Sequence, residues 1–232
     1  MRFRVSKSSS IILWDIDGTL LKISNVKTDK HLKAINNVLN VYYSGISDSS
    51  GMTDLEIIRA IANNNSRELS TKEIDSIFEN LDELTVEEMY YSPLGENINI
   101  SHTLQVIKSL GLTNGILTGN SPKRAISKID SAGLYTYFDF NFAYFGDAAL
   151  DRINLVENCT ESLNKYNSRK IIIVGDSPRD IQAAKKFGLD IVAVATGKHS
   201  YQDLLTFNPS LLLHDLKIDF DIFIDYLEDF AI

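Results

Sequence analysis

The stretch IILWDIDGTLL, residues 11–21, joins an apolar run to two acidic residues and a glycine. Residues 11–14 have the composition of a strand that is buried on both faces, as in parallel sheets covered by helices. Asp15 and Asp17 follow the strand, and Gly18 then lets the chain turn. An Asp-Gly turn explains Gly18 and one acid. Two acids at the end of a buried strand instead predict a polar site at that edge of a sheet.

Five further apolar runs alternate with helical patterns along the rest of the chain. These runs are ILT (116–118), FNFAYF (140–145), KIIIVGD (170–176), DIVAVAT (190–196) and SLLLHDL (210–216). Two intervening segments, SPKRAISKIDSAG and SPRDIQAAKKFG, begin with Ser-Pro and contain a late Gly, which is typical of helix starts and ends. The alternation predicts an α/β fold with a Rossmann-like parallel sheet.

Residues 22–95 differ, because they show helical periods without a convincing strand. An apolar stripe is formed by Leu32, Ile35, Leu39 and Tyr42. Two capping boxes follow, Thr53 with Glu56 and Ser70 with Glu73. We therefore predict a small all-helical cap domain, residues 22–95, inserted after the first strand. Residues 1–21 and 96–232 would form the α/β core domain.

Composition limits the partners and the compartment. A net charge of −8 and a pI near 5.0 argue against nucleic acid and against an anionic membrane surface. A single cysteine, Cys159, excludes an internal disulfide, and its apolar helical neighbours predict a core residue. The start, MRFRVSKSSS, has no long apolar leader, and no run reaches membrane-spanning length. We expect a cytoplasmic protein, and the sequence carries no signal for its oligomeric state.

Polar residues follow three of the predicted strands, whose carboxyl ends should meet at one edge of the sheet. They are Asp15, Asp17, Thr118, Gly119, Asn120, Asp176 and Asp180, with Arg152 at the start of a nearby helix. Carboxylates suit Mg²⁺, which takes one or two of them together with water and phosphate oxygens. The helix start after Asn120 favours an anion. Capping alone explains Asp176 or Asp180 singly, but it does not explain why acids end two of the most apolar strands.

A cation site beside an anion site predicts phosphoryl transfer, which can proceed through an aspartyl-phosphate. Two acids would then divide the work. One carboxylate would attack phosphorus, and the other would give a proton to the leaving oxygen and later take one from water.

The motifs DIDGTLL, ILTGN and VGDSPRD occur here in the order used by the haloacid dehalogenase-like hydrolase superfamily. The resemblance covers essentially the whole chain, and GMTDLEIIRAI in the insert resembles the helical cap of phosphoglycolate phosphatase-like members. It implies that Asp15 is the nucleophile and Asp17 the general acid/base. It also implies that Thr118 hydrogen-bonds the phosphoryl group, beside the anion site predicted at Gly119 and Asn120. It further implies Mg²⁺ held by Asp15, the backbone carbonyl of Asp17, Asp176 and Asp180.

One position departs from that pattern. The superfamily usually has a lysine before the last acidic motif, whereas FGDAALDRINLV offers Arg152. Arginine can neutralise the same charge, although it is not interchangeable with lysine. Lys123 and Lys198 are the alternatives for this role. The four histidines, at positions 31, 102, 199 and 214, show no metal-ligand spacing and are expected at the surface or as caps.

We therefore predict a Mg²⁺-dependent phosphatase that hydrolyses a small phosphorylated metabolite, with a phosphoglycolate-like compound among the candidates. Asp17 argues against a dehalogenase, because members of that branch lack the second acid. A sugar phosphomutase of the same superfamily shares both acids and is the alternative reaction. A catalytically silent regulatory or binding protein on the same scaffold is the alternative of another class, and the missing lysine is its support.

Overall fold

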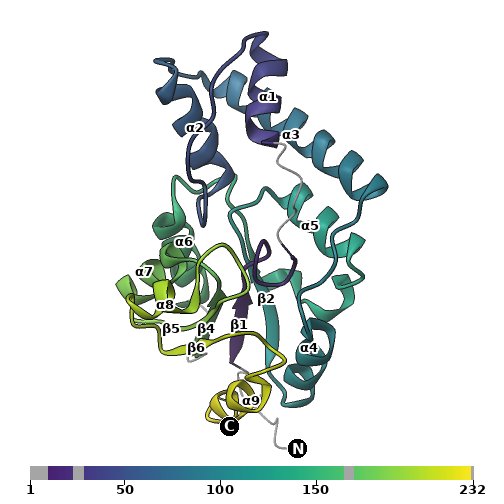
Figure 1. Cartoon of the computed structure of the whole chain (residues 1–232), viewed down its shortest axis with the longest axis vertical. Coiled ribbons are helices and arrows are strands. Elements are labelled where there is room, and N and C mark those ends of the chain that lie inside the picture. Colours follow the sequence, from purple (N-terminus) through teal and green to yellow (C-terminus); the bar gives the residue numbers. More distant parts are fainter. Residues whose placement is uncertain (1–9, 23–28, 165–169, 231–232) are drawn as a thin grey trace, which may run out of the picture.

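Strand β1 (Ile11–Trp14) lies inside a six-stranded sheet of order β3-β2-β1-β4-β5-β6 (Figure 1). The other strands are β2 (Thr113–Leu117), β3 (Ala143–Tyr144), β4 (Ile171–Gly175), β5 (Asp190–Val194) and β6 (Leu211–Leu213). All pairings are parallel, and Trp14 is in register with Ile116 of β2 and Val174 of β4. The predicted α/β fold is confirmed, and the carboxyl ends of β1, β2 and β4 lie side by side.

The structure is a computed structural model that describes residues 10–22, 29–164 and 170–230. The expectation about the N-terminal leader concerns residues that lie almost entirely outside these ranges. Within them, none of the helices has the length and apolar character needed to cross a membrane.

Helices cover both faces of the sheet. One face carries α4 (Ile100–Ser109), α5 (Pro122–Ser131) and α9 (Phe220–Glu228), and the other carries α6 (Arg152–Asn164), α7 (Pro178–Lys186) and α8 (Tyr201–Leu205). Side chains of β1 alternate between the two apolar clusters, Ile12 and Trp14 in the first, Ile11 and Leu13 in the second. Cys159 is fully buried in the second cluster, which confirms the prediction of a core residue. A strand buried on both faces fixes the position of the residues that follow it.

The predicted strand 140–145 is mostly wrong. Residues Phe140–Phe142 form a 3₁₀ turn, η2, which follows a first 3₁₀ turn, η1 (Tyr135–Tyr137), and only Ala143–Tyr144 is strand. The carboxylate of Asp139 accepts from the amide of Asn141, and the Asp139 carbonyl accepts from Phe142. These local bonds compete with strand pairing, because an Asp side chain at the start of a turn commonly accepts hydrogen bonds from nearby backbone amides.

The insert is helical, with α1 (Lys30–Leu39), α2 (Asp54–Asn64) and α3 (Thr71–Tyr91). Figure 1 shows these three helices beyond the carboxyl ends of the strands. They enclose an apolar cluster of their own, which includes Ile35, Ile58 and Leu81. The cap therefore faces the edge of the sheet where the polar residues were predicted.

The helix ends of the insert match the sequence in part. Ser70 and Glu73 form the predicted capping box. Thr53 caps α2 through the amide of Glu56, but the Glu56 carboxylate pairs with Arg179 of α7 at 2.9 Å instead of closing the box. The predicted stripe fails at Tyr42, which is exposed because α1 ends at Leu39 and the next residue is left-handed.

The two segments that connect cap and core run side by side. The amide of Lys22 donates to the Gly95 carbonyl at 3.1 Å, and the amide of Asn97 donates to the Leu20 carbonyl at 2.8 Å. The side chain of Asn97 donates to the carbonyls of Gly18 and Thr19. The connection between cap and core is thus bonded directly to the loop that carries Asp17. The boundaries at 21/22 and 95/96 stay predictions.

Candidate active site

Asp15 is buried at the end of β1 and is paired with Arg152, the first residue of α6. A guanidinium nitrogen of Arg152 lies 3.1 Å from the Asp15 carboxylate, donates to the Leu117 carbonyl at 3.1 Å, and also pairs with Asp180. Burial raises the pKa of Asp15 to about 7, with Asp180 and Asp17 adding to the rise and Arg152 opposing it. The charged form of Asp15 is therefore disfavoured, and a further cation nearby would stabilise it.

Asp17 is held by different partners. The ammonium of Lys128, on α5, donates to both Asp17 oxygens at 2.8 and 2.6 Å, and the Asn120 amide donates to one of them at 2.8 Å. Burial would raise the pKa of Asp17, but Lys128 and Asn120 hold it below its ordinary value. The two acids of the opening motif are therefore engaged by two separate sets of side chains.

Asp176 follows β4 and packs against the turn after β1. Thr19 donates to its carboxylate at 3.3 Å. A Cβ atom on Gly18 would lie 2.5 Å from an Asp176 oxygen, and Gly18 has φ of +89°, so this position requires glycine. Burial raises the pKa of Asp176, and repulsion from Asp15 and Asp180 raises it further. Asp15 and Asp176 thus form a pair of buried carboxylates that repel each other.

The Asp15 and Asp176 carboxylates are the kind of oxygen ligands that bind a divalent cation such as Mg²⁺. In the described ranges, no group of three or more His, Cys, Asp or Glu side chains is arranged to hold a metal ion. Mg²⁺ is typically held by one or two carboxylates and otherwise by water and substrate oxygens, which Asp15 and Asp176 satisfy. Asp180 is turned elsewhere, because one oxygen accepts from the amide and hydroxyl of Ser177 and the other pairs with Arg152. Its direct coordination of a metal stays a prediction.

The three residues after β2 are all buried, and two of them line the cavity. Thr118 is fully buried, and its hydroxyl accepts from the side-chain amide of Asn120 at 2.9 Å. Gly119 and Asn120 line the cavity beside Asp15 and Asp17. Gly119 also meets the cap, because its carbonyl accepts from the Asp54 amide at 2.7 Å and a Cβ atom there would lie 2.3 Å from the Met52 carbonyl oxygen.

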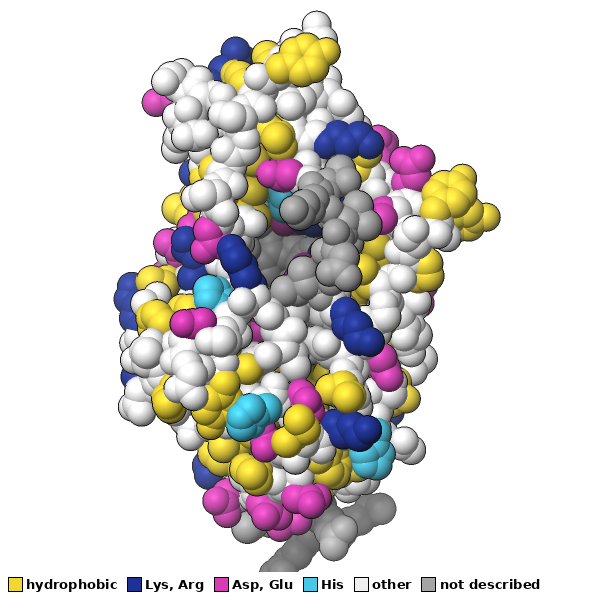
Figure 2. Space-filling model, in the orientation of Figure 1, with side chains coloured by type: hydrophobic (Ala, Val, Ile, Leu, Met, Phe, Trp, Pro, Cys, Tyr) yellow, Lys and Arg dark blue, Asp and Glu magenta, His cyan; other side chains and the backbone are white. Residues whose placement is uncertain are grey.

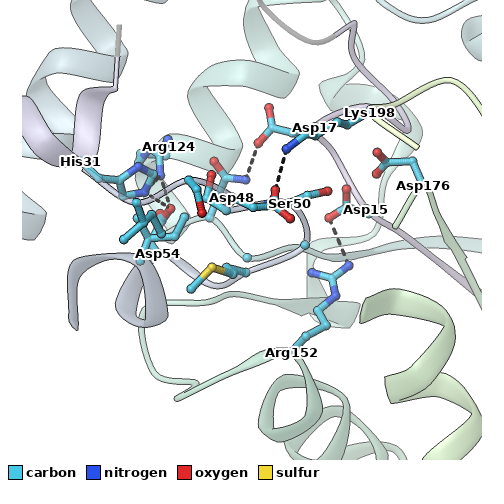
Figure 3. A pocket seen from close by; sticks show the side chains of 18 residues that line it. Asp15, Asp17, His31, Asp48, Ser50, Asp54, Arg124, Arg152, Asp176 and Lys198 are labelled. Carbon is cyan, nitrogen blue, oxygen red and sulfur yellow. Dashed lines mark hydrogen bonds and ion pairs between the residues drawn. The ribbon is translucent and has the colours of Figure 1, made fainter. Parts of the chain in front are cut away.

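A cavity of about 320 Å³ separates the cap from the edge of the sheet. Its core wall includes Asp15, Asp17 and Asp176, which lie together in Figure 3. Its cap wall includes loop 46–52, which is tied to the core where Ser50 bonds His199 at 3.0 Å and Asp48 pairs with Lys198 at 2.7 Å. The cavity is thus enclosed by two parts of the chain that contact each other directly.

A cluster at the other end of the cavity was missed from the sequence. Asp54 of the cap pairs with the buried Arg124 of α5, bonds His31 at 2.8 Å and accepts from the Ser121 amide at 2.7 Å. Figure 3 shows His31, Arg124 and Asp54 gathered at one end of the cavity. Burial would raise the pKa of Asp54, but Arg124 and His31 hold it well below its usual value. The expectation that His31 is a surface or capping residue is wrong, since its side chain is 14% exposed, lines the cavity and bonds to Asp54.

Of the three cations considered for the Asp15 charge, Arg152 is the one in contact with Asp15. Lys198 lines the cavity but is paired with Asp48, and Lys123 is exposed. Lys128 was not predicted. A signal existed, because Arg124 and Lys128 are four residues apart on the helix face that also carries the buried Ala125 and Ile129. Two basic residues on an apolar face indicate acidic partners behind it.

Comparison with known proteins identifies the family and the fold. A family profile described as haloacid dehalogenase-like hydrolase matches residues 12–194. A predicted phosphoglycolate phosphatase from Haemophilus somnus 129PT superposes with a TM-score of 0.66 at 18% identity, over 93% of this chain and 98% of that one. A putative beta-phosphoglucomutase from Bacteroides vulgatus superposes with a TM-score of 0.69 at 21% identity, over 96% and 90%.

A third solved structure carries a bound sugar phosphate. It is CbbY from Rhodobacter sphaeroides in complex with xylulose-(1,5)bisphosphate, with a TM-score of 0.66 at 18% identity, over 89% of this chain and 94% of that one. No curated protein matched the sequence. At these identities the superpositions establish the shared fold, and the profile, which spans most of the core and the whole insert, establishes the family. The chain belongs to the haloacid dehalogenase-like hydrolases.

Proposed function

We propose that this protein is a Mg²⁺-dependent phosphatase that hydrolyses a small phosphorylated metabolite. The observation that carries the proposal is the separation of the two acids, with Asp15 paired to Arg152 and Asp17 held by Lys128 and Asn120. Such a division is what a reaction needs when one carboxylate forms a bond and the other moves protons.

In the proposed reaction, an oxygen of Asp15 attacks phosphorus and the bond from phosphorus to the ester oxygen breaks. This step requires Asp17 in its protonated form, and the proton passes to that departing oxygen. Asp17 then takes a proton from water, which attacks the phosphorus of the aspartyl-phosphate and releases inorganic phosphate and free Asp15. Arg152 balances charge on Asp15, and the Gly119 and Asn120 segment borders the phosphoryl group.

Asp15, Asp176 and the backbone carbonyl of Asp17 would hold Mg²⁺, whose charge would neutralise the phosphoryl oxygens. Asp180 supports this group through Arg152 and Ser177. The fit rests on two carboxylates whose burial raises the pKa of both, with repulsion from Asp15 adding to the rise at Asp176.

The cavity supports a small substrate. Its volume of about 320 Å³ lies at the lower end of the range for small-molecule sites. Phosphoglycolate is the first compound to test, because a protein of similar fold is described as a predicted phosphoglycolate phosphatase.

The surface and the cysteine support the proposed setting. On the face shown in Figure 2, Lys and Arg side chains are interspersed with acidic ones, which fits a small metabolite better than nucleic acid. Cys159 is free and buried. We therefore propose a cytoplasmic enzyme, where thiols stay reduced.

The test is phosphate release from p-nitrophenyl phosphate and from a panel of phosphorylated metabolites, with Mg²⁺ and then with EDTA. We expect turnover that requires the metal and is abolished by Asp15→Asn. The absence of metal-dependent turnover above the Asp15→Asn background would refute the phosphatase proposal and favour a silent scaffold. Isomer formation from hexose phosphates without phosphate release would instead identify a phosphomutase.

A further inference from the structure

Lys128 occupies an unusual position for a charged side chain. It lies on the inner face of α5, and its side chain is 5% exposed, whereas the side chain of its partner Asp17 is 44% exposed. Burying an ammonium is unfavourable unless partners compensate for the lost water. The Asp17 carboxylate, by contrast, keeps contact with the cavity that it lines. The pair therefore places a buried cation behind a half-exposed acid.

The bonds of Lys128 form a chain that fixes the direction of the Asp17 carboxylate. The ammonium donates to both Asp17 oxygens and to the Asn120 side-chain oxygen at 2.7 Å. The Asn120 side-chain nitrogen then donates to Asp17 at 2.8 Å and to Thr118 at 2.9 Å. Both ends of the Asn120 amide are thus assigned, and the amide cannot rotate without losing bonds at each end.

This chain pulls Asp17 toward α5 and away from the group around Asp15. Asp15 pairs with Arg152 on α6, on the opposite face of the sheet from α5. Asp17 lines the cavity, whereas Lys128 does not and lies behind it. Lys128 is therefore placed to act through Asp17 and has no contact with the cavity of its own.

We propose that Lys128, assisted by Asn120, is the positioning residue that holds the Asp17 carboxylate toward the ester oxygen and off the metal. This inference rests on the proposed phosphatase function and adds a residue that fixes the geometry of proton transfer. Lys128 itself does not touch substrate. It matters for the proton steps because general acid–base catalysis requires the carboxyl to lie within hydrogen-bond reach of the reacting oxygen.

The leaving group separates a positioning role from a structural one. p-Nitrophenolate departs without help, whereas an alkoxide needs a proton from Asp17. We expect Lys128→Met to lower kcat for an alkyl phosphate by about 100-fold, the lower end of general acid contributions. Formation of the phosphoenzyme from p-nitrophenyl phosphate in the first turnover should change by less than about fivefold, and KM should stay within about twofold, because substrate binding is untouched.

Two further variants serve as controls. Lys128→Arg keeps the charge but not the geometry of a single ammonium, so we expect the same selective loss in smaller degree. Lys108→Met removes an exposed lysine from α4 and should leave both rates unchanged. Circular dichroism and thermal melting check that each variant folds, and Lys128→Arg carries the test if Lys128→Met does not fold.

A double-mutant cycle with Asp17→Asn gives the decisive comparison. If Lys128 acts through Asp17, adding Lys128→Met to Asp17→Asn should change the alkyl phosphate rate by less than about twofold. The inference would be overturned if the rate losses of Lys128→Met and Asp17→Asn multiplied in the double variant, or if Lys128→Met lowered the rates on both esters equally; Lys128 would then have a structural role. Wild-type rates in Lys128→Met would also overturn it. An inactive wild type would refute the proposed function, and the inference would fall with it.

Discussion

Arg152 joins the two acidic motifs of the core, because one guanidinium nitrogen lies 3.1 Å from Asp15 and pairs with Asp180 as well. Asp15 follows β1 and Asp180 lies in the first turn of α7, so the contact ties together elements that are distant in sequence. A single side chain therefore balances the charge of Asp15 and ties the end of β1 to α7.

Removing the Arg152 charge should destabilise the fold as well as the activity. Arg152→Met leaves Asp15 and Asp180 buried without their partner, and breaking a buried ion pair in this way costs about 3–5 kcal/mol. Urea unfolding in EDTA should show this loss of stability, and Arg152→Lys should lose less than Arg152→Met. The exposed Arg59 gives the matched control, and an Arg152→Met protein as stable as Arg59→Met would contradict the prediction.

Mg²⁺ should stabilise the wild-type protein against heat through Asp15 and Asp176. At a concentration of 100 times Kd, a ligand that binds only the folded state adds about 2.7 kcal/mol. Asp176→Asn should abolish the rise in Tm on adding Mg²⁺, whereas Asp225→Asn, which changes an exposed carboxylate, should retain it. The same rise in both variants would place the metal elsewhere.

Closure of the cap should depend on the absence of a side chain at Gly119. A Cβ atom there would lie 2.3 Å from the Met52 carbonyl oxygen, which is backbone and cannot move aside alone. We expect Gly119→Ala to reduce kcat/KM by about 10–100-fold, the scale produced by misplacing reacting groups by about 1 Å. Gly95→Ala is the control, since a Cβ atom at Gly95 meets nothing within 4 Å. Equal activity of the two variants would show that the cap tolerates displacement.

The Asp54 cluster should hold the cap to the start of α5. Its most specific reporter is the Ser121 amide, which donates to Asp54 at 2.7 Å. In Asp54→Ala we expect faster hydrogen exchange at this amide, because its acceptor is gone. Asp75→Ala, an exposed change on α3, should leave the exchange rate unaltered. Unchanged protection in Asp54→Ala would mean that the cap docks by other contacts.

The sequence located Asp15, Asp17, Asn120 and Asp176 because each follows a strand, and parallel strands bring such residues to one edge whatever the side-chain details. Lys128 and the pair Asp54 and Arg124 could not be found in that way. Their contacts depend on how α5 turns its inner face and on how the cap docks, which are tertiary features. The failed strand at 140–145 has a local cause, because apolar content alone does not reveal that Asp139 starts a turn.

The buried thiol of Cys159 has a practical consequence for watching the cap move. It is the chain's one cysteine, and burial raises its pKa to about 12, so the native protein should resist thiol reagents that require a thiolate. A cysteine introduced on the cap and another on the core would then be the reactive positions, with no need to delete the native residue. Fluorescent labels at such a pair would report opening and closing in solution, one molecule at a time.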